Sequence, residues 1–231
     1  MTILEFPPIE ASTPEGLLAL GGDLEISSLL LAYSQGIFPW PISSEYPLAW
    51  FSPDPRGMLF YRDLHISKGL KKILAKNDFH IKVDHNFQLV IQKCASAIRN
   101  DSASGTWITP ELMAAYINLH NAGFAHSIEA YDKDNNLAGG MYGVFLRGSF
   151  SGESMFYEQD NASKACLVWA MNFLNTHGIP WMDTQMVSPV VRALGGQEVQ
   201  REKFIHLLKQ AQNSWVTEDP FQKFRTHNSL K

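Results

Sequence analysis

Asp183 and Gln185 are the residues whose types and spacing most directly suggest chemistry. They lie two positions apart in residues 179–186, a segment whose composition predicts a strand. Side chains two apart in a strand point to the same face, so a carboxylate and an amide could act on one atom. A polar pair at a strand edge that satisfies loop amides is the alternative structural interpretation.

Glu153 is a second carboxylate of interest because its neighbours are Gly152, Ser154, Met155 and Phe156, which place it against apolar surface. A partly desolvated carboxylate needs a compensating group. An ammonium group of a ligand, an internal Arg or Lys, and a proton held at a raised pKa all remain open. The same stretch nearly matches the GxSxG nucleophile motif, but Phe156 replaces its second glycine, which argues against Ser154 as a nucleophile.

Several other chemistries lack their motifs in this chain. There is no GxxxxGK[ST] phosphate loop, no GxGxxG after a strand and no HExxH helix. Cys94 and Cys166 are far apart, and the eight histidines show no metal-ligand spacing. We therefore expect no metal, no cofactor and a reducing compartment.

The elements that must position these residues alternate between helix and strand. Residues 27–35 predict a short helix with a serine cap that ends at Gly36, and residues 37–41 must be extended. Thr109-Pro110 begins a helix that Gly123 ends, and another runs over residues 163–176. Strand-like segments are expected at residues 127–131 and 138–150, forming a hairpin, and at 179–186, with a short helix at 190–194.

Composition and punctuation indicate two units. The chain has 231 residues, 45% hydrophobic and 18% charged, as expected for a folded globular protein. Pro and Gly are dense before about residue 60, and residues 52–57 carry the strongest linker signal. We expect an α+β protein with a small N-terminal domain, residues 1–54, and a larger domain, residues 55–231. The N-terminus lacks a signal-peptide pattern and no apolar run approaches membrane-spanning length, which argues against secretion and a membrane.

The charge balance limits how the chain could meet a polyanion. Lys+Arg 19 against Asp+Glu 23 gives a net charge of −4, so any basic surface must be local. Helical spacing in residues 67–76 groups four lysines on one side and Leu70, Ile73 and Leu74 on the other. The four lysines are Lys68, Lys71, Lys72 and Lys76. With Arg56 and Arg62 nearby, this stripe could bind phosphates, although a solvated lysine face is the common alternative.

A set of ordered local strings carries more information than any single motif. They are GGDL at 21–24, GIFPW at 36–40, WFSPDPR at 50–56, GTWIT at 105–109, HSIE at 126–129, GGMYG at 139–143, GESMF at 152–156, NASK at 161–164 and DTQ at 183–185. Together these strings closely resemble the bacterial leucyl/phenylalanyl-tRNA-protein transferases over residues 13–208, nearly the whole chain.

The resemblance implies a function and a fold. Members of the family move leucine or phenylalanine from Leu-tRNA or Phe-tRNA to the N-terminal Arg or Lys of a protein, which marks the protein for degradation under the N-end rule. The larger domain would have a GNAT-like acyltransferase fold with a mixed sheet flanked by helices, without acetyl-CoA, in the cytoplasm.

The resemblance also implies roles for particular residues. Asp183 and Gln185 match the catalytic pair, although an amide oxygen is a very weak base, so Gln185 could orient the amine while Asp183 or the tRNA handles the proton. Glu153 would bind the α-ammonium group of the aminoacyl substrate. Met141 and Met155 match the apolar pocket, where a related aromatic position is here Ala170, beside Trp169. Trp40 and Trp107 match the residues that stack on the terminal adenine; core packing is the alternative for both methionines and both tryptophans.

Two other functions deserve comparison. A noncatalytic module that binds RNA acceptor ends would need neither Asp183 nor Gln185. Acetylation from acetyl-CoA would need a glycine-rich loop before the helix at 163–176, and residues 155–163 contain no glycine.

Overall fold

The computed structural model describes every residue except 1, 43–47, 98–105, 215–217 and 229–231. Gly105, part of one sequence string, lies outside the described residues. Across the described residues, strands form one sheet of three and one sheet of seven. The predicted α+β class, with a mixed sheet flanked by helices, is confirmed, and the N-terminal part adds a small sheet of its own.

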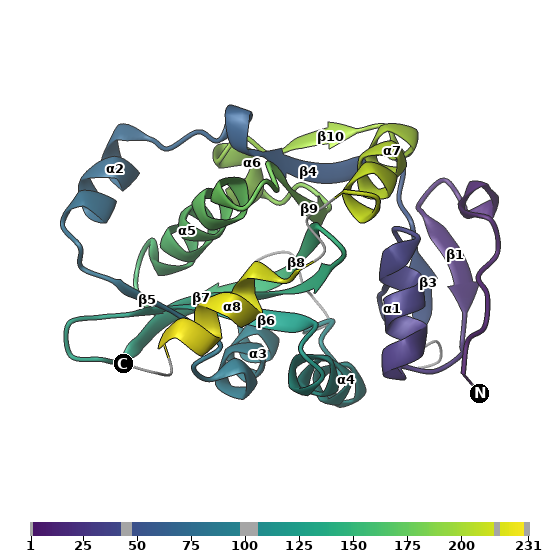
Figure 1. Ribbon diagram of the computed structural model, residues 1–231, viewed down its shortest axis with the longest axis horizontal. Helices are drawn as coiled ribbons and strands as arrows, with labels where there is room; N and C mark the ends of the chain where they lie inside the picture. Colours follow the sequence, from purple (N-terminus) through teal and green to yellow (C-terminus); the bar gives the residue numbers. More distant parts are fainter. Residues whose placement is uncertain (1, 43–47, 98–105, 215–217, 229–231) are drawn as a thin grey trace.

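The small sheet is antiparallel and belongs to the N-terminal part of the chain. Its order is β1 (Leu17–Leu20), β3 (Ala49–Phe51) and β2 (Phe38–Pro39), with α1 (Ile26–Ser34) beside it. Figure 1 shows this unit in purple and blue at the right-hand edge of the molecule. The predicted helix over 27–35 and the extended segment after it are confirmed.

The large sheet carries the residues expected to do chemistry. Its spatial order is β10 (Gln197–Val199), β4 (Arg56–Phe60), β9 (Trp181–Gln185), β8 (Ser149–Tyr157), β7 (Leu137–Leu146), β6 (Ala125–Tyr131) and β5 (His80–Val83). Neighbouring strands are antiparallel except β8 and β9, which are parallel where Ser151 pairs with Asp183. The parallel step brings Glu153 of β8 beside the Asp183–Gln185 segment of β9.

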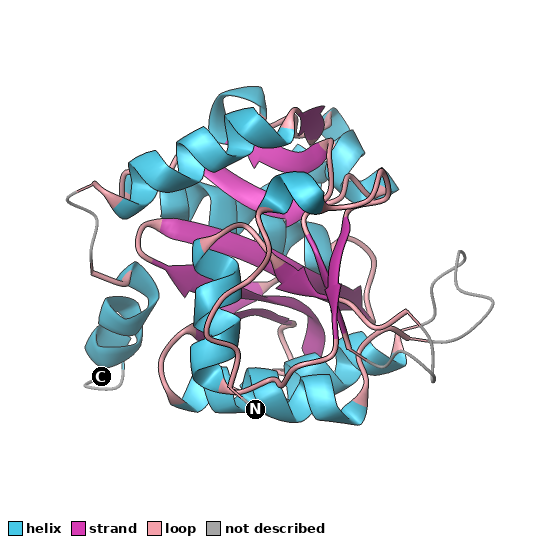
Figure 2. Ribbon diagram, turned by 90° about the vertical axis from the view of Figure 1, so that its right-hand side faces the viewer, coloured by secondary structure: helices cyan, strands magenta, loops and turns pink. Residues whose placement is uncertain are grey.

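Helices cover both faces of the large sheet, as Figures 1 and 2 show. The remaining helices are α2 (Lys68–Ala75), α3 (Phe87–Ser96), α4 (Pro110–Asn121), α5 (Ala162–Thr176), α6 (Pro189–Ala193), α7 (Arg201–Gln212) and α8 (Pro220–Asn228), with short 3₁₀ turns at Ile9–Ala11 and Tyr61–Asp63. Helices α5 and α8 pack on one face, and α3 and α4 on the other. With both faces covered, all of β6 is buried.

Local sequence explains most helix boundaries. Thr109 caps α4 by accepting a hydrogen bond from the Leu112 amide, with Pro110 at the first helical position. The predicted serine cap of α1 is wrong: the helix begins at Ile26 after Glu25, which makes no side-chain cap bond. Instead, one oxygen of Asp23 accepts hydrogen bonds from the Glu25 amide and the Ser28 hydroxyl.

One strand prediction also needs correction. Residues 138–150 do not form a single strand, because the chain turns at Arg147 and Gly148, which have φ of +45° and +78°. The turn separates β7 from β8 and makes the predicted hairpin a three-stranded meander, β6–β7–β8. A polar residue beside a glycine was the available turn signal.

The predicted domain boundary near Pro53 separates the two sheets in sequence, since β3 ends at Phe51 and β4 begins at Arg56. The hydrophobic core does not divide there, because Leu29 and Trp50 belong to the same buried cluster as Tyr116 and Tyr142. Division into residues 1–54 and 55–231 therefore stays a prediction. None of the described helices has the length and apolar composition needed to cross a membrane.

Candidate active site

Asp183 lies in the middle of a dense set of hydrogen bonds on β9. Its Oδ1 accepts from Arg56 Nε at 2.8 Å and from the Gln185 amide at 3.0 Å, and its Oδ2 accepts from Arg56 Nη2 at 2.7 Å. Ser151 Oγ donates to the same Oδ2 at 3.2 Å. Asp183 is 2% exposed and Arg56 1% exposed, so this is a buried, two-pronged ion pair.

Gln185 follows an irregularity in β9. Met58 pairs with Asp183 and Gly57 with Gln185, so Thr184 is an extra residue that bulges from the ladder. Gln185 has φ of +54°, in the left-handed region that costs free energy for a residue with a side chain. The residue paired with Gln185 on β4 is Gly57. A glycine is required at this position, because a Cβ there would lie 2.5 Å from the carbonyl carbon of Met186.

Glu153 is the extra residue of a second bulge, between the Tyr142–Ser154 and Gly143–Gly152 pairs of β7 and β8. Gln185 Nε2 donates to its Oε1 at 2.9 Å. Tyr33 donates to Oε1 at 2.8 Å and Tyr116 to Oε2 at 3.1 Å, while the two hydroxyls are 2.7 Å apart. The two bulges thus join the acid of β8 to the amide of β9.

The charge state of Glu153 reflects its surroundings. Burial raises the pKa of its carboxyl to about 7, and the charge of Asp183 adds to the rise. Hydrogen bonds from Tyr33 and Tyr116 and the charge of Arg56 act in the opposite direction. Among the described residues the donors to this carboxylate are two phenols and an amide, so an internal Arg or Lys is not its direct partner.

The two methionines lie beside this cluster. Met141 on β7 is paired with Met155 on β8, two residues beyond Glu153. A Cβ on Gly152 would be 3.6 Å from Met141 Cε, so this methyl group lies over the strand next to Glu153. Met141 is buried and Met155 half-buried against the α5 side of the sheet. On α5, Ala170 is buried, and Trp169 stacks on Phe173 with ring centroids 4.8 Å apart.

Trp40 and Trp107 stack on each other, with ring centroids 4.7 Å apart and an interplanar angle of 11°. Trp40 follows β2 and Trp107 precedes α4, and the two partners of the stack are 67 positions apart in the sequence. Both are half-buried against the core between α1, α3 and α4. They form one aromatic pair rather than two independent surfaces.

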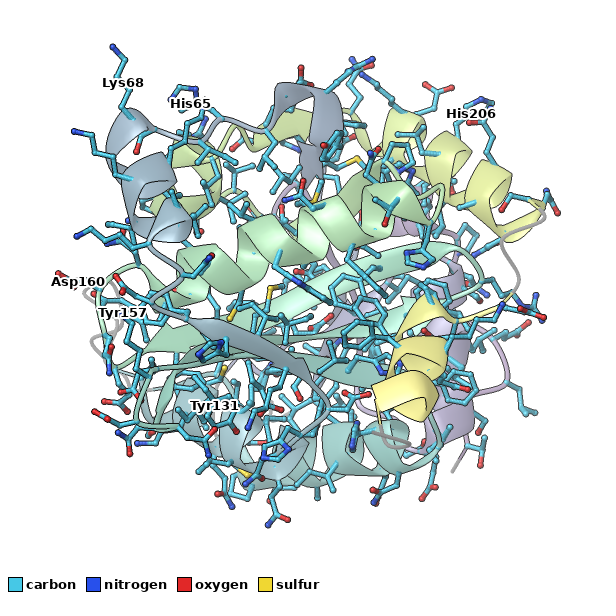
Figure 3. All side chains as sticks on the ribbon, turned by 60° about the vertical axis from the view of Figure 1, so that its left-hand side comes forward. His65, Lys68, Tyr131, Tyr157, Asp160 and His206 are labelled. Atoms are coloured by element: carbon cyan, nitrogen blue, oxygen red, sulfur yellow. The ribbon has the colours of Figure 1, made fainter. Side chains whose placement is uncertain are left out.

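Lys68, Lys71, Lys72 and Lys76 are all exposed, Leu70 and Leu74 pack in or against the core, and Ile73 is half-buried, so the predicted amphipathic helix is confirmed. Figure 3 shows Lys68 extending outward from α2 near His65. The inclusion of Arg56 in this basic surface is wrong, because Arg56 is buried against Asp183. Arg62 is exposed.

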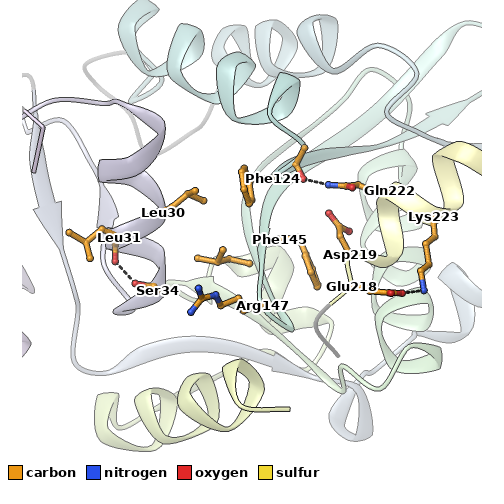
Figure 4. A pocket seen from close by; sticks show the side chains of 12 residues that line it. Leu30, Leu31, Ser34, Phe124, Phe145, Arg147, Glu218, Asp219, Gln222 and Lys223 are labelled. Atoms are coloured by element: carbon orange, nitrogen blue, oxygen red, sulfur yellow. Dashed lines mark hydrogen bonds and ion pairs between the residues drawn. The ribbon is translucent and has the colours of Figure 1, made fainter. Parts of the chain in front are cut away.

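A groove lies elsewhere, between α1, the α4–β6 turn, the end of β7 and the start of α8 (Figure 4). It encloses about 800 Å³ and is lined by apolar side chains such as Leu30, Phe124 and Phe145 with Arg147 and Asp219 among them. None of the predicted site residues lines it.

Sequence reasoning missed Tyr33, Tyr116 and Ser151 and misplaced Arg56. For Arg56 a signal was present: it begins the apolar run Gly57-Met58-Leu59-Phe60, and a buried strand that starts with an arginine needs an acid nearby. The tyrosines lie on helices α1 and α4, remote in sequence from Glu153, and no local pattern in the chain indicated their contact.

A buried carboxylate, an amide and a second carboxylate are joined through hydrogen bonds, an arrangement that is chemically suited to hold and orient polar reactants. Comparison with known proteins gives the class. The family model "Leucyl/phenylalanyl-tRNA protein transferase" matches residues 58–209, and the model of its N-terminal domain matches residues 22–54.

Curated relatives agree over nearly their full length. The chain is 44% identical over 226 residues to the leucyl/phenylalanyl-tRNA–protein transferase of Colwellia psychrerythraea, covering 95% of this chain and 92% of the relative. It is 47% identical over 210 residues to that of Magnetococcus marinus, covering 89% and 88%. The chain belongs to the leucyl/phenylalanyl-tRNA protein transferase family and is an aminoacyltransferase. This finding favours an enzyme over a noncatalytic RNA-binding module.

Proposed function

We propose that the protein transfers leucine or phenylalanine from aminoacyl-tRNA to the N-terminal Arg or Lys of an acceptor protein, marking it for degradation. The hydrogen bond between Gln185 and Glu153 is the observation that supports this most, because it joins an acid for the donor amino acid to an amide for the acceptor amine. Since aminoacyl-tRNA is the donor, the reaction belongs in the cytoplasm.

The donor amino acid would lie across β7 and β8. Ionised Glu153 attracts its α-ammonium group, and the neighbouring Met141 and Met155 offer polarisable apolar surface to its side chain. Methionine adapts to both branched and aromatic guests, which suits selection of both leucine and phenylalanine.

The acceptor amine would be oriented by Gln185. Because Gln185 Nε2 donates to the Glu153 carboxylate, the other end of the same amide, Gln185 Oε1, is left as a hydrogen-bond acceptor. That oxygen can accept a hydrogen bond from the amine and align its lone pair with the ester carbonyl. Asp183 receives four hydrogen bonds already, so we assign it to holding the site rather than to contact with the amine.

The reaction forms one bond and breaks one. The neutral amine nitrogen attacks the ester carbonyl carbon, and the tetrahedral intermediate collapses as the C–O bond to the terminal ribose breaks. The nitrogen loses a proton and the departing ribose oxygen gains one, leaving a peptide bond and deacylated tRNA. Orientation of the two reactants supplies a large share of the rate enhancement in such transfers.

The tRNA would bind through two further surfaces. The terminal adenine would stack on the Trp40–Trp107 pair, and phosphates of the acceptor arm would bind the exposed lysines of α2 and Lys76, which caps its C-terminus. The phosphate contacts position the tRNA without reading its sequence.

A transfer assay tests the proposal directly. Labelled Leu-tRNA and Phe-tRNA are offered with peptides that begin with Arg, Lys or Ala, without an added cofactor. We expect label in the Arg and Lys peptides and little in the Ala peptide. Binding of tRNA without any peptide labelling would instead support the noncatalytic module.

A further inference from the structure

Arg56 occupies the centre of the contacts that hold Asp183. Its Nε and Nη2 bind the two carboxylate oxygens at 2.8 and 2.7 Å. Its Nη1 donates to the Gly36 carbonyl at 3.0 Å, in the turn that ends α1. The guanidinium therefore connects the N-terminal unit to β9 through three hydrogen bonds.

Two aromatic rings hold the guanidinium in this position. Arg56 Cζ lies 5.0 Å from the centroid of Phe38 on β2 and 4.3 Å from that of Phe204 on α7. Gly36 permits this packing, since a Cβ there would be 2.7 Å from Phe204 Cε1. Residues from three parts of the chain thus fix one buried cation.

The Asp183 carboxylate, which Arg56 holds, also accepts a hydrogen bond from a backbone amide. Asp183 Oδ1 accepts from the amide of Gln185, whose φ of +54° is unfavourable for a residue with a side chain. That left-handed turn carries the Gln185 side chain to Glu153, where Nε2 donates at 2.9 Å. The order of contacts is Arg56, Asp183, the Gln185 backbone, and then the Gln185 amide on Glu153.

We propose that Arg56 is a positioning residue for the transfer reaction: it fixes the Asp183 carboxylate, which holds the Gln185 backbone so that the Gln185 amide meets Glu153 and the acceptor amine. Asp183 then acts through hydrogen bonding to the backbone and takes no proton. This inference rests on the proposed function.

The test uses Arg56→Lys in the full chain, with the single-turnover transfer rate and the tRNA dissociation constant as readouts. Lysine keeps the charge but cannot bind both carboxylate oxygens in a fixed fork. We expect the rate to fall about 10- to 100-fold, since a displacement near 1 Å at reacting groups can cost that much. The tRNA dissociation constant should not change. Arg192→Lys, an exposed arginine on α6 that is paired with Glu198, is the matched control and should keep the wild-type rate.

A double-variant cycle separates positioning from a general structural role. If Arg56 acts through Asp183, Arg56→Lys causes no further loss of rate in an Asp183→Asn background. The pH profile is a second readout: Arg56→Met removes a charge that lowers the Glu153 pKa, so the acid limb should move to higher pH than in Arg56→Lys.

Three results would overturn the proposal. They are an unchanged transfer rate in Arg56→Lys, a double variant whose loss of rate is the product of the losses in Arg56→Lys and Asp183→Asn, and a tRNA affinity that falls in proportion to the rate. If Arg56→Lys does not fold, the transfer rate is measured in Ser151→Ala instead. This variant removes the hydroxyl that donates to Asp183 Oδ2 at 3.2 Å. A few-fold loss of rate that disappears in the Asp183→Asn background supports the proposal, and an unchanged rate overturns it. Wild-type protein that transfers nothing contradicts the proposed function instead.

Discussion

Gln185 donates a 2.9 Å hydrogen bond to Glu153, although 32 positions of sequence separate them. The contact depends on a bulge in each of two neighbouring strands and on the left-handed backbone of Gln185. It fixes which end of the Gln185 amide faces the carboxylate, because a carboxylate accepts and does not donate. The roles assigned to donor and acceptor amino acids follow from that orientation.

The ionisation of Glu153 gives a prediction for the pH dependence of transfer. Burial raises the pKa of its carboxyl to about 7, so below that pH the group is neutral and no longer attracts the α-ammonium of the donor. We expect kcat/KM to fall as pH drops through 7. Glu153→Gln should lower kcat/KM at pH 8 by about 10- to 100-fold, the value of a hydrogen bond to a charged group. It should also remove the part of the acid limb that comes from this carboxyl, while the part that comes from protonation of the acceptor amine, with an ordinary pKa of about 7.7–8.0, remains. Glu158→Gln, an exposed acid paired with Lys93, is the control and should keep both rate and profile.

The lysines of α2 predict salt-dependent binding of tRNA. Replacing Lys71 and Lys72 by Glu should weaken tRNA binding and reduce the slope of log affinity against log salt, because fewer counterions are released. The same charge change at the exposed Lys203 and Lys209 of α7 is the control. An equal loss of tRNA affinity in both double variants would mean that the overall charge of the protein, rather than the position of the lysines on α2, determines binding.

The tryptophan pair predicts a contact confined to the end of the tRNA. In Trp107→Ala, a short aminoacyl-adenosine mimic and full tRNA should lose affinity by the same factor, because both contain the terminal nucleoside. Stacking on a base contributes about 1–3 kcal/mol, which sets the expected loss. The Lys71/Lys72 double variant is a cross-control, since it should weaken full tRNA and leave the mimic unaffected. Loss of tRNA affinity alone in Trp107→Ala would argue against stacking on adenine.

His126 predicts a pH-dependent contribution to stability at the attachment of α8. Its Nδ1 lies 2.8 Å from Asp84 and its Nε2 2.7 Å from Asp219, which precedes α8, and Phe221 stacks on its ring. His120 also faces Asp84, at 3.7 Å. Burial of His126 opposes its charge, but the two carboxylates outweigh burial and raise its pKa to about 9.

Because the folded pKa exceeds the ordinary value of 6.5, this stabilisation is complete below pH 6.5 and is lost as pH rises through 9. The pKa difference corresponds to about 3 kcal/mol. Urea unfolding of wild type and His126→Gln between pH 6 and 10 measures it: the difference in unfolding free energy should shrink as pH rises. A constant difference would show that His126 does not act through its charge.

Sequence patterns predicted the elements better than the contacts between them. Glycine and proline placed the end of α1 and both ends of α4 correctly, because these residues restrict the backbone locally. The spacing of Asp183 and Gln185 suggested two side chains on one face of a regular strand, whereas Thr184 bulges between them. Register shifts and the choice of Asp183 as the partner of Arg56 depend on strands brought together by the fold, which no local window contains.

The variant Gln185→Asn shows whether the reach of the Gln185 amide to Glu153 sets the rate of transfer. Asparagine tolerates the left-handed backbone and keeps an amide, but it is one methylene too short to reach Glu153 in the same position. The matched control is Gln159→Asn, which shortens a surface glutamine whose amide donates to Asp132 at 2.7 Å. At saturating aminoacyl-tRNA, positioning by the Gln185 amide predicts a single-turnover rate lowered about 100-fold in Gln185→Asn, with wild-type tRNA affinity and a wild-type rate in the control. A wild-type rate in Gln185→Asn, or a loss of tRNA affinity equal to the loss of rate, would contradict it.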